Sequence, residues 1–145
     1  MIKQDTLENQ AKDIYLGIGS NLGDKKNNIE KAKFELIQND IRILLASNYY
    51  ESLSWPDPKK PKFLNIVLKV SSFLKPLDLL KMCKKIETKL GRKKTSKNSP
   101  RECDIDIIDY SFEKSNSNIL LPHPRMHLRN FVLLPLFEIN KNWIH

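Results

Sequence analysis

The sequence predicts an α+β fold whose strands and helices follow one another in the order β-α-β-β-α-β. Three observations lead to this fold class. Short runs rich in Ile, Leu and Val have the length and composition of strands. Two longer segments repeat apolar residues every three or four positions, as amphipathic helices do. Glycine, proline and short polar residues stand at the joins, where turns and helix caps are expected.

The first half of the chain predicts a strand, a helix and a second strand. Residues 14–19 form an apolar run, and residues 20–24 then form a turn that offers N-cap side chains. A helix is expected at about residues 24–39, followed by a strand at residues 41–50. The apolar stripe of this helix consists of Ile29, Ala32, Leu36 and Ile37.

The second half predicts a long loop, a strand, a helix and a last strand. Residues 51–62 contain three prolines and must be a loop. A strand follows at residues 63–72, Pro76 opens a helix as its first residue, and Gly91 ends that helix. The strand is expected to place Leu64, Ile66, Leu68 and Val70 on one face. The apolar stripe of the helix consists of Leu79 or Leu80, Cys83, Ile86 and Leu90.

This order is that of a ferredoxin-like core, in which two helices pack on an antiparallel sheet. Residues 122–140 predict short helices that extend the core at its C-terminal end. The length is that of one domain. We therefore expect a single domain at residues 13–145, preceded by a flexible extension at residues 1–12.

The composition favours an anionic partner. The 145 residues carry a formal net charge of +8, which suits a nucleotide, a nucleic acid or a membrane surface. No apolar run reaches the roughly 20 residues of a membrane span, and the polar N-terminus is no secretory signal. Cys83 and Cys103 fall in a helix pattern and a strand pattern, which predicts reduced core residues and a cytoplasmic location.

Two carboxylates alternate with apolar residues in the last strand. Asp104 and Asp106 share one face of it, while Cys103, Ile105 and Ile107 point the other way. The loop at residues 92–101 just upstream carries five cations in ten residues. Close carboxylates favour a divalent cation, Mg²⁺ above all, and together with a cationic loop they suit a metal-bound polyphosphate. The alternative is the solvent face of a half-buried strand.

The tail has a second polar cluster. His123, Arg125, His127, Arg129 and Phe131 stand within nine positions, and prolines on both sides of the first histidine stiffen the backbone. Taken alone, the cluster is as readily structural as functional.

Five motifs stand in order along nearly the whole chain. They are Leu16-Gly17-Ile18-Gly19-Ser20-Asn21-Leu22-Gly23-Asp24, Phe63-Leu64-Asn65, Leu90-Gly91-Arg92, Pro100-Arg101-x-x-Asp104-x-Asp106-Ile107 and Leu121-Pro122-His123-Pro124-Arg125-Met126-His127-x-Arg129-x-Phe131-Val132-Leu133-x-Pro135-Leu136. Each motif is modest alone, but five in the right order are highly specific. Together they resemble the 6-hydroxymethyl-7,8-dihydropterin pyrophosphokinase family of folate biosynthesis, from about residue 14 to residue 139.

The resemblance implies an enzyme that transfers the β,γ-diphosphate of ATP to the hydroxymethyl group of 6-hydroxymethyl-7,8-dihydropterin and releases AMP. It also implies a ferredoxin-like core. By motif position, Asp104 and Asp106 would hold two Mg²⁺ ions, with ATP as the co-substrate.

The ATP site follows from the same motifs and from the cationic loop. Arginine suits this task because it pairs with phosphate oxygens through two hydrogen bonds. The ATP-binding residues expected are Arg92, Lys94, Lys97, Arg101, His123 and Arg129. The catalytic set expected is Arg92, Arg101, Asp104 and Asp106.

The resemblance also implies a pterin site. Phe63 and Phe131 would sandwich the ring, Asn65 would hydrogen-bond it, and backbone groups near Ser52 and Leu53 would complete the pocket. A flat heterocycle suits aromatic faces and an amide that both donates and accepts.

Some positions depart from the family pattern. Residues 97–99 lack a tryptophan and a glycine that are usual there, Glu102 adds a negative charge, and Leu128 replaces a common acidic residue. A degenerate member that turns over poorly is therefore one alternative. The other is an RNA-recognition module, but residues 63–68 lack the Lys/Arg-Gly-aromatic run which that module needs. We expect a cytoplasmic monomer that binds neither nucleic acid nor a membrane.

Overall fold

The computed structural model describes residues 10–54, 56–91 and 99–110. Residues 1–9 of the expected N-terminal extension and the C-terminal helices expected from the sequence lie outside these ranges, whereas Lys12, which was expected in that extension, is the first residue of the first strand. The described chain follows the predicted order of elements, with one additional short strand. The elements are β1 (Lys12–Ser20), α1 (Lys25–Gln38), β2 (Arg42–Ala46), β3 (Tyr50–Ser52), β4 (Phe63–Ser72), α2 (Pro76–Lys89) and β5 (Asp104–Tyr110).

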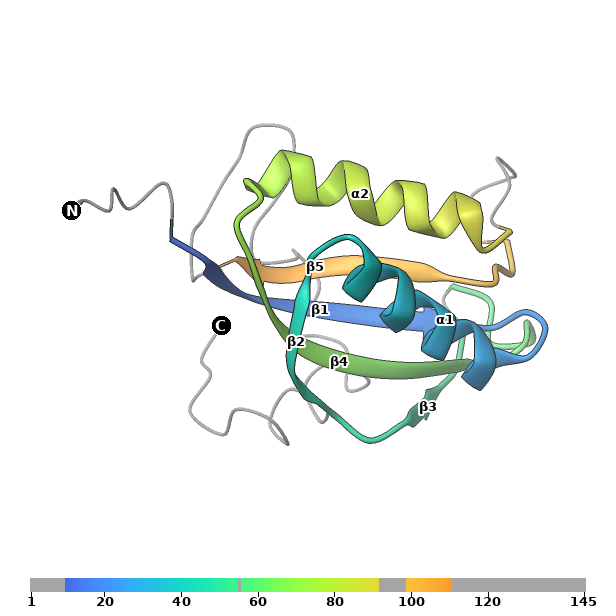
Figure 1. Cartoon of the computed structure of the whole chain (residues 1–145). Coiled ribbons are helices and arrows are strands. Elements are labelled where there is room, and N and C mark those ends of the chain that lie inside the picture. Colours follow the sequence, from blue (N-terminus) through green and yellow to red (C-terminus); the bar gives the residue numbers. More distant parts are fainter. Residues whose placement is uncertain (1–9, 55, 92–98, 111–145) are drawn as a thin grey trace, which may run out of the picture.

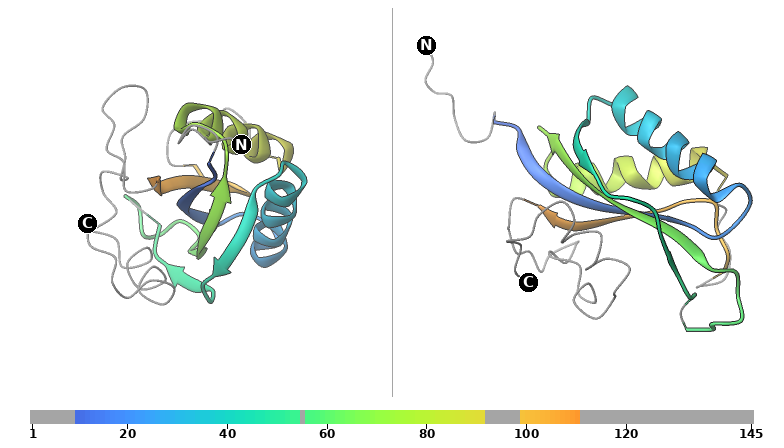
Figure 2. Two further views of the ribbon diagram at one scale, coloured as in Figure 1. Left: turned by 60° about the vertical axis from the view of Figure 1, so that its left-hand side comes forward. Right: turned by 90° about the horizontal axis from the view of Figure 1, so that it is seen from below.

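The strands form one antiparallel sheet, and both helices cover the same face of it (Figures 1 and 2). The strand order is β2-β4-β1-β5, with β3 also paired to β4. β1 pairs with β4 along its whole length, from Lys12 opposite Ser72 to Ser20 opposite Leu64. β5 pairs with the other side of β1. This order confirms the α+β, ferredoxin-like core.

The core lies between the helices and the sheet. Alternate residues of β1, β4 and β5 meet one stripe from each helix there. α1 contributes Ile29, Ala32 and Leu36, and α2 contributes Leu79, Cys83 and Ile86. The sheet contributes Ile14, Leu16, Ile18, Ile66, Leu68, Val70, Ile105 and Ile107.

Most predicted boundaries are confirmed by the caps. Asp24 is the N-cap of α1, where its carboxylate accepts a hydrogen bond from the Asn27 N–H at 3.2 Å. Pro76 is the first residue of α2. Gly91 follows the end of α2 with a φ of 111°, a left-handed conformation that favours glycine.

The strand expected at residues 41–50 is wrong as one element, because it divides into β2 and β3 around Ser47. The Ser47 N–H donates to the carbonyl of Val67, but the Val67 N–H donates to Ser47 Oγ at 2.9 Å. A side chain thus replaces the backbone carbonyl that would continue the ladder. The loop predicted at residues 51–62 is correspondingly shorter, because β3 reaches Ser52.

Ile37 was also predicted wrongly as part of the buried stripe of α1, since 53% of its surface is exposed. It directly follows the buried Leu36, and one residue turns a helix by about 100°. The alternative left open in α2 is resolved in favour of Leu79, which is fully buried.

A buried carboxylate holds β5 at the edge of the described sheet. Glu87 of α2 is only 2% exposed, and its Oε2 accepts a hydrogen bond from the Ile105 N–H at 2.7 Å. Its Oε1 lies 3.5 Å from Nζ of Lys84. The donor belongs to the residue between Asp104 and Asp106, so the contact fixes the backbone of the carboxylate pair.

Replacing Glu87 by alanine should destabilise the protein. The Ile105 N–H would lose a charged acceptor in a buried place, at a cost of about 1.5–3 kcal/mol. Glu87→Gln retains an acceptor oxygen and should cost less. Urea unfolding measures the stabilities, and amide exchange at Ile105 follows the contact itself. The control Lys84→Ala removes only an exposed partner and should change little. Equal stability of Glu87→Ala and the wild type would contradict this account.

Candidate active site

The carboxylate pair lies on the face of the sheet opposite the helices. Asp104 and Asp106 are half-buried, whereas Ile105 and Ile107 between and after them are buried in the core. This confirms the predicted alternation. In the register with β1, Asp104 lies opposite Gly19 and Asp106 lies opposite Gly17. The two carboxylates therefore stand beside a stretch of β1 that carries no side chains on this face.

That bare stretch makes room for side chains from β4. A Cβ atom added at Gly19 would lie 2.9 Å from Oδ1 of Asn65 and 3.2 Å from Cδ1 of Phe63. Asn65 and Phe63 thus approach β1 from the side opposite β5. Two of the predicted pterin residues and Asp104 therefore flank the same glycine.

Asn65 is fixed in place by β3. It is 4% exposed, and its Nδ2 donates to the carbonyl of Tyr50 at 3.1 Å and to Oγ of Ser52 at 2.9 Å. Both amide protons are engaged, which orients Oδ1 toward Gly19. The structure therefore brings Ser52 and Asn65 together. Leu53 comes directly after β3 with its side chain exposed.

Arg101 connects the two groups of predicted residues. Its Nη1 lies 3.7 Å from Oδ2 of Asp104, and both side chains are mostly buried. Its guanidinium carbon lies 5.8 Å from the centre of the Phe63 ring, within the range of a cation–π contact. Its Nε donates to the carbonyl of Ser99 at 3.2 Å. A fixed positive charge thus stands between the carboxylates and the aromatic ring.

The donor set suits magnesium that arrives with a polyphosphate. Within residues 10–54, 56–91 and 99–110, no group of three or more His, Cys, Asp and Glu side chains could hold a metal ion by itself. Mg²⁺ is usually bound by one or two carboxylates while phosphate oxygens and water complete its coordination. Asp104 and Asp106 fit that role.

The thiols of the described chain are buried away from the carboxylate pair's face of the sheet. Cys83 and Cys103 are free and buried, as the sequence predicted. Burial raises the pKa of the Cys83 thiol to about 12, and the neighbouring Glu87 carboxylate raises it further. The thiol therefore stays protonated near neutral pH. The chemistry available at the site is charge neutralisation and positioning.

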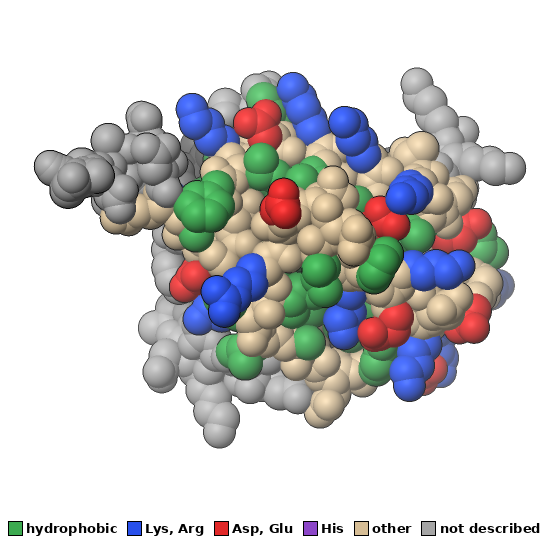
Figure 3. Space-filling view, in the orientation of Figure 1, with side chains coloured by type: hydrophobic (Ala, Val, Ile, Leu, Met, Phe, Trp, Pro, Cys, Tyr) green, Lys and Arg blue, Asp and Glu red, His purple; other side chains and the backbone are tan. Residues whose placement is uncertain are grey.

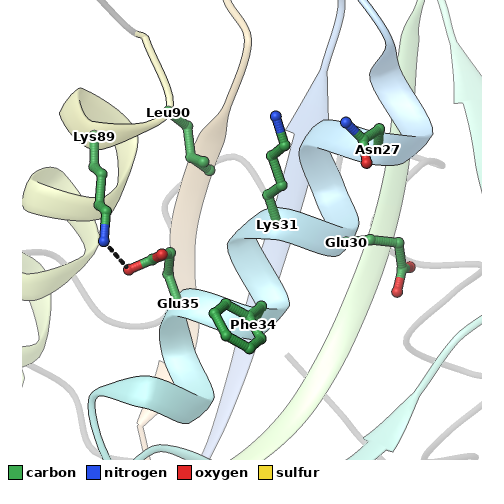
Figure 4. Close-up of a pocket in the computed structure, with 7 residues that line it drawn as sticks. All are labelled: Asn27, Glu30, Lys31, Phe34, Glu35, Lys89 and Leu90. Atoms are coloured by element: carbon green, nitrogen blue, oxygen red, sulfur yellow. Dashed lines mark hydrogen bonds and ion pairs between the residues drawn. The ribbon is translucent and has the colours of Figure 1, made fainter.

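A groove on the other face does not belong to this site. It has a volume of about 480 Å³ and lies between α1 and α2, where Glu35 and Lys89 form an ion pair at 3.0 Å (Figure 4). It is also lined by Phe34 and Leu90. Basic and acidic side chains are interspersed on this helical face of the molecule (Figure 3). The groove contains none of the residues that the sequence predicted for the site.

Six of the predicted site residues lie outside the described residues. They are Arg92, Lys94, Lys97, His123, Arg129 and Phe131. Glu102, which was expected near the phosphates, has its carboxylate next to Gly91, where an added Cβ atom would lie 3.2 Å from Oε2.

The reasoning from the residues missed two buried polar groups, Glu87 and Asn21. Glu87 is the one charged residue among the buried positions of α2. It stands four positions after Cys83 of the expected stripe, and this spacing, which places both residues on one face of the helix, was the available signal. Asn21 is 3% exposed and directly follows β1. Its place between a buried strand and a helix cap made it resemble an ordinary turn residue.

Comparison with known proteins identifies the family. Residues 15–141 match 7,8-dihydro-6-hydroxymethylpterin-pyrophosphokinase. The pyrophosphokinase of Aquifex aeolicus is 43% identical over 133 residues, which cover 91% of this chain and 82% of that protein. The folic acid synthesis protein FOL1 of Dictyostelium discoideum is 44% identical over the same share of this chain, but the match spans only 20% of its own length.

A solved structure agrees in fold. The crystal structure of an HPPK-DHPS protein in complex with substrates superposes with a TM-score of 0.68. It covers 93% of this chain and 41% of that one at 16% identity. The match over nearly the whole sequence, the high identity to the Aquifex enzyme and the shared fold show that the chain belongs to the 7,8-dihydro-6-hydroxymethylpterin-pyrophosphokinase family.

Proposed function

We propose that this enzyme transfers the β,γ-diphosphate of ATP to the hydroxymethyl group of 6-hydroxymethyl-7,8-dihydropterin on the face of the sheet opposite the helices, and releases AMP. As a member of the family, it is an ATP-dependent diphosphotransferase of folate biosynthesis. The observation that carries the proposed location is the grouping of Asp104, Arg101 and Phe63 around Gly19. The degenerate and RNA-binding alternatives receive no support from these relatives.

The phosphates of ATP would lie between the carboxylate pair and Arg101. Two Mg²⁺ ions held by Asp104 and Asp106 would neutralise phosphate charge and polarise the oxygens of the reaction. Arg101 would bind phosphate oxygens, and its contact with Phe63 keeps the guanidinium in place. This reaction depends on positioning and electrostatic stabilisation more than on a strong base. The remaining ATP contacts proposed by motif position are Arg92, Lys94, Lys97, His123 and Arg129.

The pterin would lie against Phe63, with Phe131 on its other face. Asn65 would hydrogen-bond the ring, and the engagement of its Nδ2 by Tyr50 and Ser52 leaves Oδ1 as the group directed at the site. Backbone groups near Ser52 and Leu53 would complete the pocket. This placement brings the hydroxymethyl group of the pterin toward the phosphates beside Arg101.

We also propose that the chain acts as a cytoplasmic monomer in which residues 13–145 form one domain, preceded by a flexible extension that ends before Lys12, the first residue of β1. The two free, buried thiols support a reducing compartment. No helix of the described residues could cross a membrane. Interspersed charges of both signs on the helical face favour small anionic substrates over nucleic acid as the partners of the positive chain.

Substitution of either carboxylate should nearly abolish the reaction. Asp104→Asn and Asp106→Asn each keep the shape of the side chain but remove a charged oxygen ligand. We expect AMP release from ATP, Mg²⁺ and 6-hydroxymethyl-7,8-dihydropterin to fall by about 100-fold or more. Circular dichroism should show an intact fold. The control is Asp13→Asn, at the opposite end of β1. Near-wild-type turnover of either site variant at saturating Mg²⁺ would contradict the assignment.

Adding a methyl group at Gly19 should weaken pterin binding. The new Cβ would approach Asn65 and Phe63 too closely, and overpacking of this kind costs about 1–3 kcal/mol. If Asn65 moves to relieve this close contact, pterin binding weakens by about 5- to 150-fold. Calorimetric titration measures the Kd of the pterin, and the Kd of an ATP analogue should stay close to the wild-type value. At the control position Gly17, the nearest atom is the movable end of Ile108 at 3.3 Å, so Gly17→Ala should have less effect. Equal losses for both ligands in Gly19→Ala would contradict the placement.

A further inference from the structure

Asn21 is a buried amide at a junction of three chain segments. It follows β1 directly and is 3% exposed. The segment before β5 and the loop between β3 and β4 both reach it. A buried polar side chain needs partners for its donors and its acceptor, and their identity shows which segments Asn21 joins.

On one side Asn21 pairs with Arg101. The Asn21 N–H donates to the carbonyl of Arg101 at 3.1 Å, and the Arg101 N–H donates to Oδ1 of Asn21 at 2.8 Å. The backbone N–H and the side-chain oxygen of Asn21 thus bind the backbone carbonyl and the backbone N–H of Arg101. Arg101 is the same residue whose guanidinium contacts Asp104 and Phe63.

On the other side Asn21 holds the loop between β3 and β4. Its Nδ2 donates to Oγ of Ser54 and to the carbonyl of Pro61, both at 3.2 Å. Ser54 Oγ also donates to the carbonyl of Pro61. The two ends of this loop are therefore joined to each other and to Asn21. The loop begins directly after Ser52, which orients Asn65.

We propose that Asn21 is a positioning residue that couples binding of the pterin to binding of ATP. The inference rests on the proposed function, in which Arg101 binds phosphate and the segment after Ser52 borders the pterin. A planar amide presents its acceptor and its donors in fixed directions, so a shift of either segment strains the bonds to the other. In a buried network such strain is not relieved by water. Coupling of this kind is reciprocal between the two ligands.

The amide has two functions that one isosteric substitution can separate. Asn21→Asp keeps the oxygen that accepts from the Arg101 N–H but removes both protons given to Ser54 and Pro61. Asn21→Ala removes all of the side-chain contacts. Ser54→Ala removes one acceptor on the loop side alone. The three variants therefore separate the effect of the contact with Arg101 from the effect of the contacts with Ser54 and Pro61.

The test measures each ligand with and without the other. Calorimetry gives Kd values for 6-hydroxymethyl-7,8-dihydropterin and for a non-hydrolysable ATP analogue with Mg²⁺. In the wild type, each ligand should tighten binding of the other by about 5- to 150-fold. In Asn21→Asp this factor, a ratio of Kd values in which a direct effect of the added charge on phosphate binding cancels, should approach one. The coupling factor of Ser54→Ala should lie between the wild-type value and one.

A second measurement needs no ligand. Amide exchange of the Arg101 N–H in the free protein should accelerate in Asn21→Ala and stay slow in Asn21→Asp. Full coupling retained in Asn21→Asp, or a wild-type factor of one, would overturn the inference. Failure of the proposed function is a different result, since the wild type would then release no AMP or bind no pterin. If Asn21→Ala does not fold, the isosteric Asn21→Asp still decides the question.

Discussion

The alternation of side chains across β5 is the constraint on which the site depends. One face of the sheet is covered by two helices, so β5 must direct Ile105 and Ile107 toward them, and Asp104 and Asp106 then stand on the other face. A slip of one residue against β1 would bury both carboxylates and expose both isoleucines. The hydrophobic core thus fixes the register, and the register fixes the carboxylate pair.

The sequence predicted those features that depend on neighbouring residues. The helix stripes, the Asp24 cap, Pro76 and the alternation of β5 each follow from spacing along a short segment. The break between β2 and β3 could not be predicted in this way, because it depends on a hydrogen bond between Ser47 and Val67, twenty positions apart.

For the site, residue chemistry and resemblance contributed different parts. Spacing alone predicted the pair of carboxylates and a nearby cation, but left a solvated strand face as an equal alternative. The motifs added Asn65 and Phe63 as partners. What neither could give is the contact of Arg101 with both groups, at 3.7 Å from Asp104 and 5.8 Å from the Phe63 ring. The contact with Asp104 is local, since the two residues are three positions apart, but the contact with Phe63 joins segments 38 positions apart and exists only once the sheet is assembled.

The electrostatics of this arrangement explain why so many polar groups are buried around it. Two carboxylates on one face of a strand repel each other, and Arg101 offsets part of that repulsion before any cation binds. Flexible side chains or a frayed edge strand would let the carboxylates move apart instead. Glu87 opposes this movement by accepting a hydrogen bond from the Ile105 N–H, and Asn21 holds the backbone of Arg101 through a second hydrogen bond. The buried polar residues thus keep mutually repelling groups in a geometry that binding of metal and phosphate stabilises.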